Sequence, residues 1–409
     1  MSATAEPATG QDARAVPDLL YSAEEQDLRD AVRSLLAERA GWPAVLARTE
    51  TSETYDAGLW QLLAADVGCA GLLIPESHGG AGASYREAAV VAEETGRAAA
   101  PVPYLGSAVV ATAALLAVPD ADLLAGLAAG TLTAALAVPF AMRPFATRPF
   151  ASRPSGGLPG GVRVTPPQPG DPPGQARLTG TIAGVADALP AGVLLVPAAS
   201  VPQDSVPAGL YAVPADAPGV ALTPVVSLDQ TRQLADVTLE GAVGRPVASG
   251  PDVAAAVHAG LTAGAGMLAS EQLGLAEKCL EITVSYLKER YQFARPVGSF
   301  QALKHRLADL WVAVLQARAA ARYAAACLAG DDPDTPVAVA LAKAACGDAA
   351  ILAAQECVQL HGGIGFTWEH PAHLYLKRAK SASTGFGTPD WHRGTLAGLA
   401  DLPGPEAAG

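Results

Sequence analysis

The stretch that decides the fold is YLKERYQFARPVGSFQALKHRLAD, residues 286–309. The sequence on both sides of it is rich in Ala, Leu, Glu and Lys, which favour helices. Arg295 and Pro296 interrupt this run, and proline breaks a helix because it lacks the amide N–H and clashes with the preceding turn. The stretch therefore predicts a helix, a turn and a second helix.

The whole C-terminal part, residues 249–409, is predicted to be a helical bundle. Long periodic segments start near Val253 and are broken near residues 295–296, 331–336 and 362–365. Long helices joined by short connections bury their apolar faces most simply by packing side by side.

The N-terminal part, residues 1–130, is also predicted to be helical. Apolar residues recur at helical spacing from Ser22 to Arg39, and Ser22 with Glu25 suits a capping box at the start of that helix. Glycines and a proline predict a tight loop at residues 71–82.

The middle part, residues 131–248, is predicted to be a small β domain. It contains an insertion, residues 143–178, so dense in Pro and Gly that it cannot hold a helix, and we expect a disordered surface loop there. The β-favouring runs are residues 192–196, 209–213 and 219–226. The fold class is thus mainly α with a central β domain.

Composition excludes several classes of protein. The net charge of -13, without a basic stripe, argues against a nucleic-acid partner. The five cysteines form no metal-ligand spacing, so we expect reduced core thiols and no metal. The longest apolar run, Val109 to Val118, is too short to span a bilayer and predicts a buried helix. With no leader-like start, a cytoplasmic protein without a membrane partner is expected.

Three stretches carry a family resemblance: residues 286–309, QLHGGIGFTWEH at residues 359–370, and LIPESHGGAG at residues 73–82. Together they resemble the acyl-CoA dehydrogenase family. The resemblance implies an N-terminal helical domain, a middle β-barrel-like domain and a C-terminal four-helix bundle. It also implies FAD as cofactor, α,β-dehydrogenation of an acyl-CoA thioester, and an electron-transferring flavoprotein as electron acceptor.

A group of residues in the matching stretches has the chemistry to hold a dinucleotide. Arg290 presents a planar cationic fork that can clamp a diphosphate at two points, while glycines let the backbone approach a bulky cofactor. The resemblance implies that the ADP half of an FAD belonging to the neighbouring subunit, in a homo- or hetero-tetramer, is held by Arg290, Gln292, Phe293, Gln359 and Gly363. This cofactor set comprises Arg290, Gln292, Phe293, Gln301, Gln359, Gly362, Gly363 and Thr388.

Four members of the cofactor set also have a simpler reading when taken alone. Arg290 could cap a helix C-terminus, Gln359 could be a satisfied core amide, and the two glycines could end a helix. The occurrence of the whole set in register favours the cofactor interpretation.

The catalytic base that the resemblance implies is missing. Dehydrogenation requires a carboxylate to remove the α-proton. At the two positions where the family carries it, this chain has Phe386 and Gly264. Other acids nearby are Glu271, Glu369 and Asp390. Their simpler roles are a buried helix contact, a hydrogen bond that orders a loop, and a helix N-cap, respectively.

The middle domain departs from the family as well. Ala137 to Pro139 stands where the family has Thr-Glu-Pro, and residues 178–187 lack the family's tryptophan, so the chain's own flavin cradle is altered. Three hypotheses follow: a self-sufficient flavoenzyme with an unusual base, a non-catalytic partner that completes the FAD site of a sister subunit, or a helical scaffold that has lost the cofactor. Flavin content and turnover of the isolated chain distinguish them.

Overall fold

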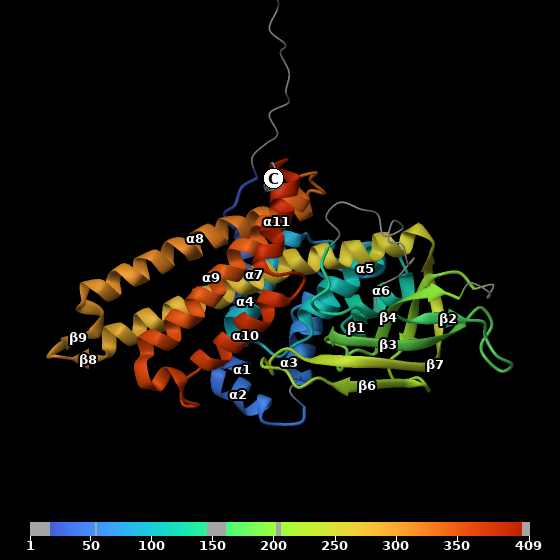
Figure 1. Cartoon of the computed structure of the whole chain (residues 1–409), viewed down its shortest axis with the longest axis horizontal. Helices are drawn as coiled ribbons and strands as arrows, with labels where there is room; N and C mark the ends of the chain where they lie inside the picture. Colours follow the sequence, from blue (N-terminus) through green and yellow to red (C-terminus); the bar gives the residue numbers. More distant parts are fainter. Residues whose placement is uncertain (1–16, 54, 145–160, 202–205, 403–409) are drawn as a thin grey trace, which may run out of the picture.

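The computed structural model describes residues 17–53, 55–144, 161–201 and 206–402. Helices form the first part of the chain, strands the middle and long helices the last part, which confirms the predicted fold class. The long helices and the strands lie at opposite ends of an elongated molecule, with the N-terminal helices between them (Figure 1).

The N-terminal helices begin where the capping box predicts. The amide of Glu25 donates to Ser22 Oγ at 3.1 Å, and the amide of Ser22 donates to Glu25 Oε2 at 2.7 Å. The helices are α1 (Ala23–Arg39), α2 (Trp42–Thr49), α3 (Ala57–Gln61), α4 (Tyr85–Ala98), α5 (Thr112–Ala117) and α6 (Ala121–Ala128), with π-helical segments at Leu62–Asp66 and Tyr104–Ala111 and 3-10 turns at Cys69–Gly71 and Glu76–His78.

The middle strands close into a barrel. The hydrogen-bonded order β4-β2-β3-β7-β5 returns to β4, because β4 also pairs with β5. β1 pairs in parallel with β4, and β6 pairs with β7. The strands are β1 (Ala134–Leu136), β2 (Arg163–Thr165), β3 (Ala176–Ala186), β4 (Val193–Ser200), β5 (Gly209–Pro214), β6 (Val220–Pro224) and β7 (Leu234–Ser249).

The three predicted β runs correspond to β4, β5 and β6, but the predicted insertion contains more structure than expected. Strand β2 and the start of β3 lie within residues 143–178, so the expectation of a disordered loop is wrong there. β2 pairs with β3 and β4, and its β-branched Val164 is fully buried in the barrel core. Residues 145–160 of the insertion lie outside the described residues.

The C-terminal helices end where the sequence predicts breaks. They are α7 (Pro251–Glu289), α8 (Gln301–Ala329), α9 (Thr335–His361), α10 (Ala372–Thr384) and α11 (Pro389–Leu399). A hairpin of β8 (Tyr291–Gln292) and β9 (Arg295–Pro296), followed by a 3-10 turn at Val297–Ser299, joins α7 to α8, and η7 (Gly362–Phe366) follows α9.

Helix α7 crosses α4 at unusually short range. A Cβ atom on Gly274 would lie 1.8 Å from the carbonyl oxygen of Glu93, and one on Gly96 would lie 2.0 Å from that of Glu271. Only glycine permits this approach. The crossing brings the N-terminal helices against the bundle core.

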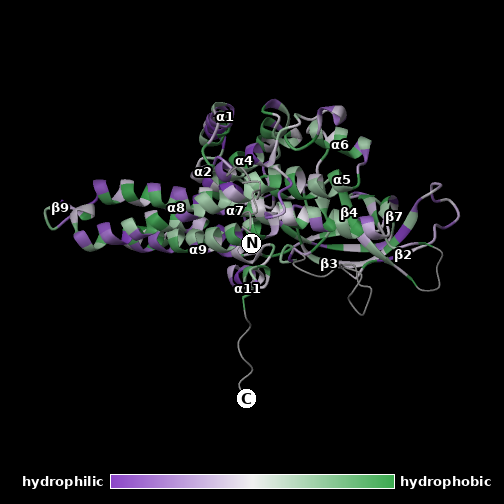
Figure 2. Ribbon diagram, turned by 90° about the horizontal axis from the view of Figure 1, so that it is seen from above, coloured by the Kyte–Doolittle hydropathy of each residue, from purple (hydrophilic) through white to green (hydrophobic). Residues whose placement is uncertain are grey.

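Two of the helices are apolar enough to be mistaken for membrane spans. By length and composition α7 and the segment Thr335–Phe366 could cross a bilayer, but 72% and 67% of their most apolar windows are buried inside the protein, as in core helices. Figure 2 shows hydrophilic and hydrophobic residues alternating along α8 and α9, as expected for helices with one buried and one exposed face. The run Val109 to Val118, predicted as a buried helix, lies largely in the buried π-helix and α5.

Candidate functional site

The two positions where the family carries its base face each other. Phe386 follows α10 and is 3% exposed, while Gly264 lies in the middle of α7. A Cβ atom on Gly264 would lie 2.8 Å from Phe386 Cζ. The phenyl ring therefore occupies the space into which a side chain at position 264 would project, and neither residue can accept a proton.

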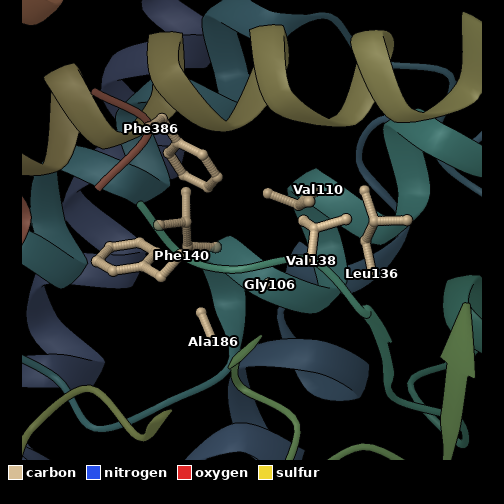
Figure 3. A pocket seen from close by; sticks show the side chains of 8 residues that line it. Gly106, Val110, Leu136, Val138, Phe140, Ala186 and Phe386 are labelled. Atoms are coloured by element: carbon tan, nitrogen blue, oxygen red, sulfur yellow. The ribbon is translucent and has the colours of Figure 1, made fainter. Parts of the chain in front are cut away.

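The Phe386 ring lines a small apolar cavity. Figure 3 shows this ring directly below the α7 ribbon, with Phe140 on the side away from that helix. The two rings meet edge to face with centroids 5.4 Å apart. The free volume is about 10 Å³, which is room for about one water molecule. The lining consists of Leu105, Gly106, Val110, Leu136, Val138, Phe140, Ala186 and Phe386.

We call this region the plugged cavity, because two phenyl rings fill it. Among the described residues that line it, none carries a carboxylate. A three-ring flavin system does not fit into the volume of one water, so the chain's own cradle does not match the cofactor that the resemblance implies.

The backbone holds the plug in place. The amide of Phe386 donates to the carbonyl of Phe140 at 2.9 Å, which ties the loop after α10 to the segment after β1. Burial lowers the pKa of His392 to about 4, so its ring is neutral, and Nε2 lies 3.0 Å from the carbonyl of Phe386 as a donor. Phe386 itself has a φ of +53°, in the left-handed region that disfavours non-glycine residues.

Phe140 is a functional residue that the sequence reasoning missed. A Cβ atom on Gly385 would lie 2.3 Å from Phe140 Cζ, so the ring rests on the glycine next to Phe386. The available signal was its position directly after Ala137 to Pro139, where the family motif is already altered.

Glu271 is held as an ion-paired carboxylate rather than a free base. It is 3% exposed, with Oε2 at 2.5 Å from Arg232 Nη2 and Oε1 at 2.8 Å from Arg378 Nε. Burial alone would raise the pKa of Glu271, but the charges of Arg232 and Arg378 outweigh it and lower the pKa to about 2. Arg232 also lies over the Phe140 ring, 5.2 Å from its centroid, so the ion pair borders the plug.

The other two acids are exposed and outside the plugged cavity. Glu369 lies in the turn after η7, where its amide donates to Thr367 Oγ1 at 3.3 Å. Asp390 pairs with Arg393 at 2.7 Å. The expectation that Asp390 caps α11 is wrong, because Pro389 already occupies the first helical turn and Thr388 Oγ1 accepts the amide of Trp391.

All members of the cofactor set except Thr388 lie at the end of the bundle where α7 stops and α8 begins. There the ring of Tyr286 stacks on that of His361 with centroids 4.4 Å apart, and Arg306 pairs with Glu356 at 2.7 Å. These contacts join the end of α7, the start of α8 and the end of α9, on which the set is carried. We call this end of the bundle the cofactor corner. Thr388, the eighth member, is exposed and caps α11.

The chemistry of the cofactor corner fits the diphosphate part of a dinucleotide. Arg290 and Gln359 are exposed, and a Cβ atom on Gly362 or Gly363 would meet no atom of the described chain within 4 Å. An open backbone corner beside a guanidinium and amide groups suits an anionic ligand. Phe293, 86% exposed, lies at the hairpin tip.

The simpler readings hold only in part. Arg290 does cap α7, through its amide to the carbonyl of Tyr286, and Gly362 does end α9. Both roles use the backbone and leave the side chain or the open corner available. Gln359 is exposed, so the core-amide reading is wrong.

The five cysteines are buried and free, as a set of core thiols would be. In the described ranges, the structure brings together no group of three or more His, Cys, Asp or Glu side chains that could hold a metal ion.

Comparisons with known proteins match this arrangement. The chain fits the acyl-CoA dehydrogenase N-terminal domain over residues 22–120 and the C-terminal domain over residues 254–398. Over 88% of its length it is 38% identical to acyl-CoA dehydrogenase IpdE2 of Mycobacterium tuberculosis, of which it covers 92%.

Solved structures of other proteins have a similar fold. A chain of the ChsE4-ChsE5 complex from Mycobacterium tuberculosis is 28% identical, with a TM-score of 0.78 over 95% of this chain and 100% of that one. A chain of the Tcur3481-Tcur3483 steroid ACAD is 31% identical, with a TM-score of 0.76 over 92% of this chain and 98% of that one. Butyryl-CoA dehydrogenase from Megasphaera elsdenii, 21% identical with a TM-score of 0.80 over 94% of this chain and 100% of that one, shares the fold.

Proposed function

The chain belongs to the acyl-CoA dehydrogenase family, whose members depend on FAD, and we propose that it is the non-catalytic subunit of a hetero-oligomeric acyl-CoA dehydrogenase. In this proposal a sister subunit supplies the base and the flavin cradle. This chain supplies the cofactor corner that completes the sister's FAD site. The assembled enzyme then carries out α,β-dehydrogenation of an acyl-CoA thioester.

The plugged cavity is the observation that carries the proposal. The reaction needs an acyl chain held between a carboxylate and a flavin. Here Phe386 and Phe140 fill that space and leave room for about one water. Glu271, a buried acid of the same helix as Gly264, is held by two arginines with a pKa of about 2, which makes it a poor proton acceptor.

The cofactor corner supports the second half of the proposal. Arg290 would bind the diphosphate of the sister's FAD by a two-point contact, Gln292 and Gln359 would donate from their amides, and the glycines would let the backbone approach. When bound, FAD supplies the hydride acceptor. A scaffold without cofactor would have no physical need for this exposed set.

Exposed aromatic side chains beside the corner favour a covering subunit. Phe293, Phe366 and Trp368 are 86%, 75% and 64% exposed. Large apolar side chains gathered on one part of a surface commonly mark an interface. The two similar solved structures named after pairs of proteins favour a related but different chain as the partner.

Two further parts complete the proposal, the first of them taken from the family. An electron-transferring flavoprotein would take the electrons from the assembled enzyme, and the complex would work in the cytoplasm.

The test is to purify the chain alone and together with its sister homologue, then to measure visible flavin absorbance and acyl-CoA-dependent reduction of an artificial acceptor. We expect a colourless, inactive chain and a yellow, active complex. A yellow chain that reduces the acceptor alone would overturn the proposal.

A second variant tests the corner itself. Arg290→Ala in the complex should lower the flavin retained after gel filtration, while Arg163→Ala, an exposed arginine on the barrel, should not. Equal flavin content in both variants would remove Arg290 from the site.

A further inference from the structure

A third region of the molecule has the form of a ligand site, apart from the plugged cavity and the cofactor corner. A cavity of about 260 Å³ lies where α1, α2, α4, α7 and α10 meet, far larger than the space for one water beside Phe386. Its volume approaches the lower end of small-molecule pockets. The lining residues that matter are Arg33, Leu36, Trp42, Arg97, Lys278 and Tyr375.

Three cationic side chains line this cavity. Arg33, Arg97 and Lys278 line it together, and Glu94 is the acid among them. Glu94 is almost fully buried and accepts both from Arg33, at 2.7 and 2.9 Å, and from Arg29 at 2.9 Å. Its hydrogen bonds therefore go to two guanidinium groups, and it makes none to Lys278.

The positive charges of Arg33, Arg97 and Lys278 repel one another. Burial, followed by the charge of Arg33, lowers the pKa of Arg97, and burial followed by Arg97 and Arg33 lowers the pKa of Lys278. A partly enclosed cleft lined by cations concentrates a positive potential, which attracts anions.

We propose that this cavity binds an oxyanion carried by a small molecule, either a phosphate ester or a carboxylate. The chain itself contains a stand-in for that ligand. Glu281 contacts both Arg97 and Lys278, the latter at 2.9 Å, which shows that one carboxylate can engage the two cations at once. The Glu281 side chain is 47% exposed, and ion pairs of that kind contribute little to stability, so a ligand can displace it.

The apolar and aromatic lining residues define the rest of the ligand. Leu36 is buried, and Trp42 and Tyr375 present aromatic rings. The hydroxyl of Tyr375 donates to the carbonyl of Arg97 at 3.2 Å, which fixes the aromatic wall relative to the cations. A compact planar or apolar group attached to the oxyanion fits this division of the cavity.

The test uses isothermal titration of the full chain with phenyl phosphate, benzoate and inorganic phosphate. Tighter binding of phenyl phosphate than of benzoate would assign the phosphate source, and the reverse order the carboxylate. Weaker binding of inorganic phosphate than of phenyl phosphate would support the apolar wall. Failure of all three probes to bind at millimolar concentration would overturn the proposal. This outcome is independent of whether the chain or its complex retains flavin.

Variants with opposite expected effects locate the site. Lys278→Met keeps the side-chain length and removes the charge, and it should weaken binding about tenfold. Glu281→Gln removes the internal competitor and should strengthen binding. Arg39→Gln, an exposed arginine on α1 that pairs with Glu38, is the control and should change nothing. If neither Lys278→Met nor Glu281→Gln changes the affinity, the oxyanion binds elsewhere and the assignment is refuted.

Discussion

Phe386 combines two features with opposite effects on stability, and replacing it by Ala and by Gly separates them. Its ring is 3% exposed and packs against Phe140, so truncation to Ala should cost about 3–5 kcal/mol. Its φ of +53° costs a non-glycine residue about 1–2 kcal/mol, which glycine avoids. We therefore expect Phe386→Gly to be about 1 kcal/mol more stable than Phe386→Ala.

This order reverses the usual one, and urea denaturation followed by circular dichroism measures it. At an ordinary helical position glycine is about 0.5–1 kcal/mol less stable than alanine. Ala308, exposed within α8, provides that reference through Ala308→Gly. A Phe386→Ala cost below about 1 kcal/mol would show that the ring is not a core plug. A glycine variant less stable than the alanine variant would refute the strained backbone.

Two buried acids, Glu271 and Glu93, should give the stability of the fold opposite dependences on pH. The pKa of Glu271 falls from 4.5 to about 2 on folding, so its stabilisation is present above pH 4.5 and is lost as pH falls towards 2. Glu271→Gln should cost about 3–5 kcal/mol at pH 7, because Arg232 and Arg378 stay buried, and the Tm gap to the parent should close in acid; a constant gap would contradict the ion pair. Burial, with Glu277 adding to it, raises the pKa of Glu93 to about 7, so its protonated form favours folding below pH 4.5 and this contribution is lost as pH rises through 7. Glu93→Gln should therefore gain Tm relative to the parent between pH 5 and pH 8, and parallel Tm profiles would contradict this.

The sequence predicts those parts of the fold that depend on local interactions. The capping box at Ser22 uses residues three positions apart, and the breaks around residues 295–296 and 362–365 follow from proline and glycine. The N-cap of α11 was assigned wrongly because Thr388 and Asp390 are both good capping residues, and the choice between them depends on how Pro389 starts the helix.

The candidate site could be predicted only as separate positions. Counting along the chain identifies Phe386 and Gly264 as the places without a base, but it does not show that the phenyl ring fills the space above the glycine. Phe140 comes from another domain, about 250 residues earlier, and only the tertiary fold brings it to Phe386. The pairing of Glu271 with two arginines is likewise a long-range contact.

The plug makes one further prediction, about where FAD acts. In this chain the contact between the segment after β1 and the loop after α10 is made by Phe140, Phe386 and the hydrogen bond between their backbones. Since protein atoms already fill that space, a flavin ring has no room to bind there and cannot stabilise the fold. A ligand raises Tm only when it binds the folded state, so added FAD should leave the Tm of the isolated chain unchanged and raise that of the complex with the sister subunit. Differential scanning fluorimetry over a range of FAD concentrations measures both, with the Arg290→Ala complex as the control that should respond less. A rise in the Tm of the isolated chain that persists in its Arg290→Ala variant would mean that the two rings move aside, and the plug would then be a gate rather than the replacement for a lost flavin site.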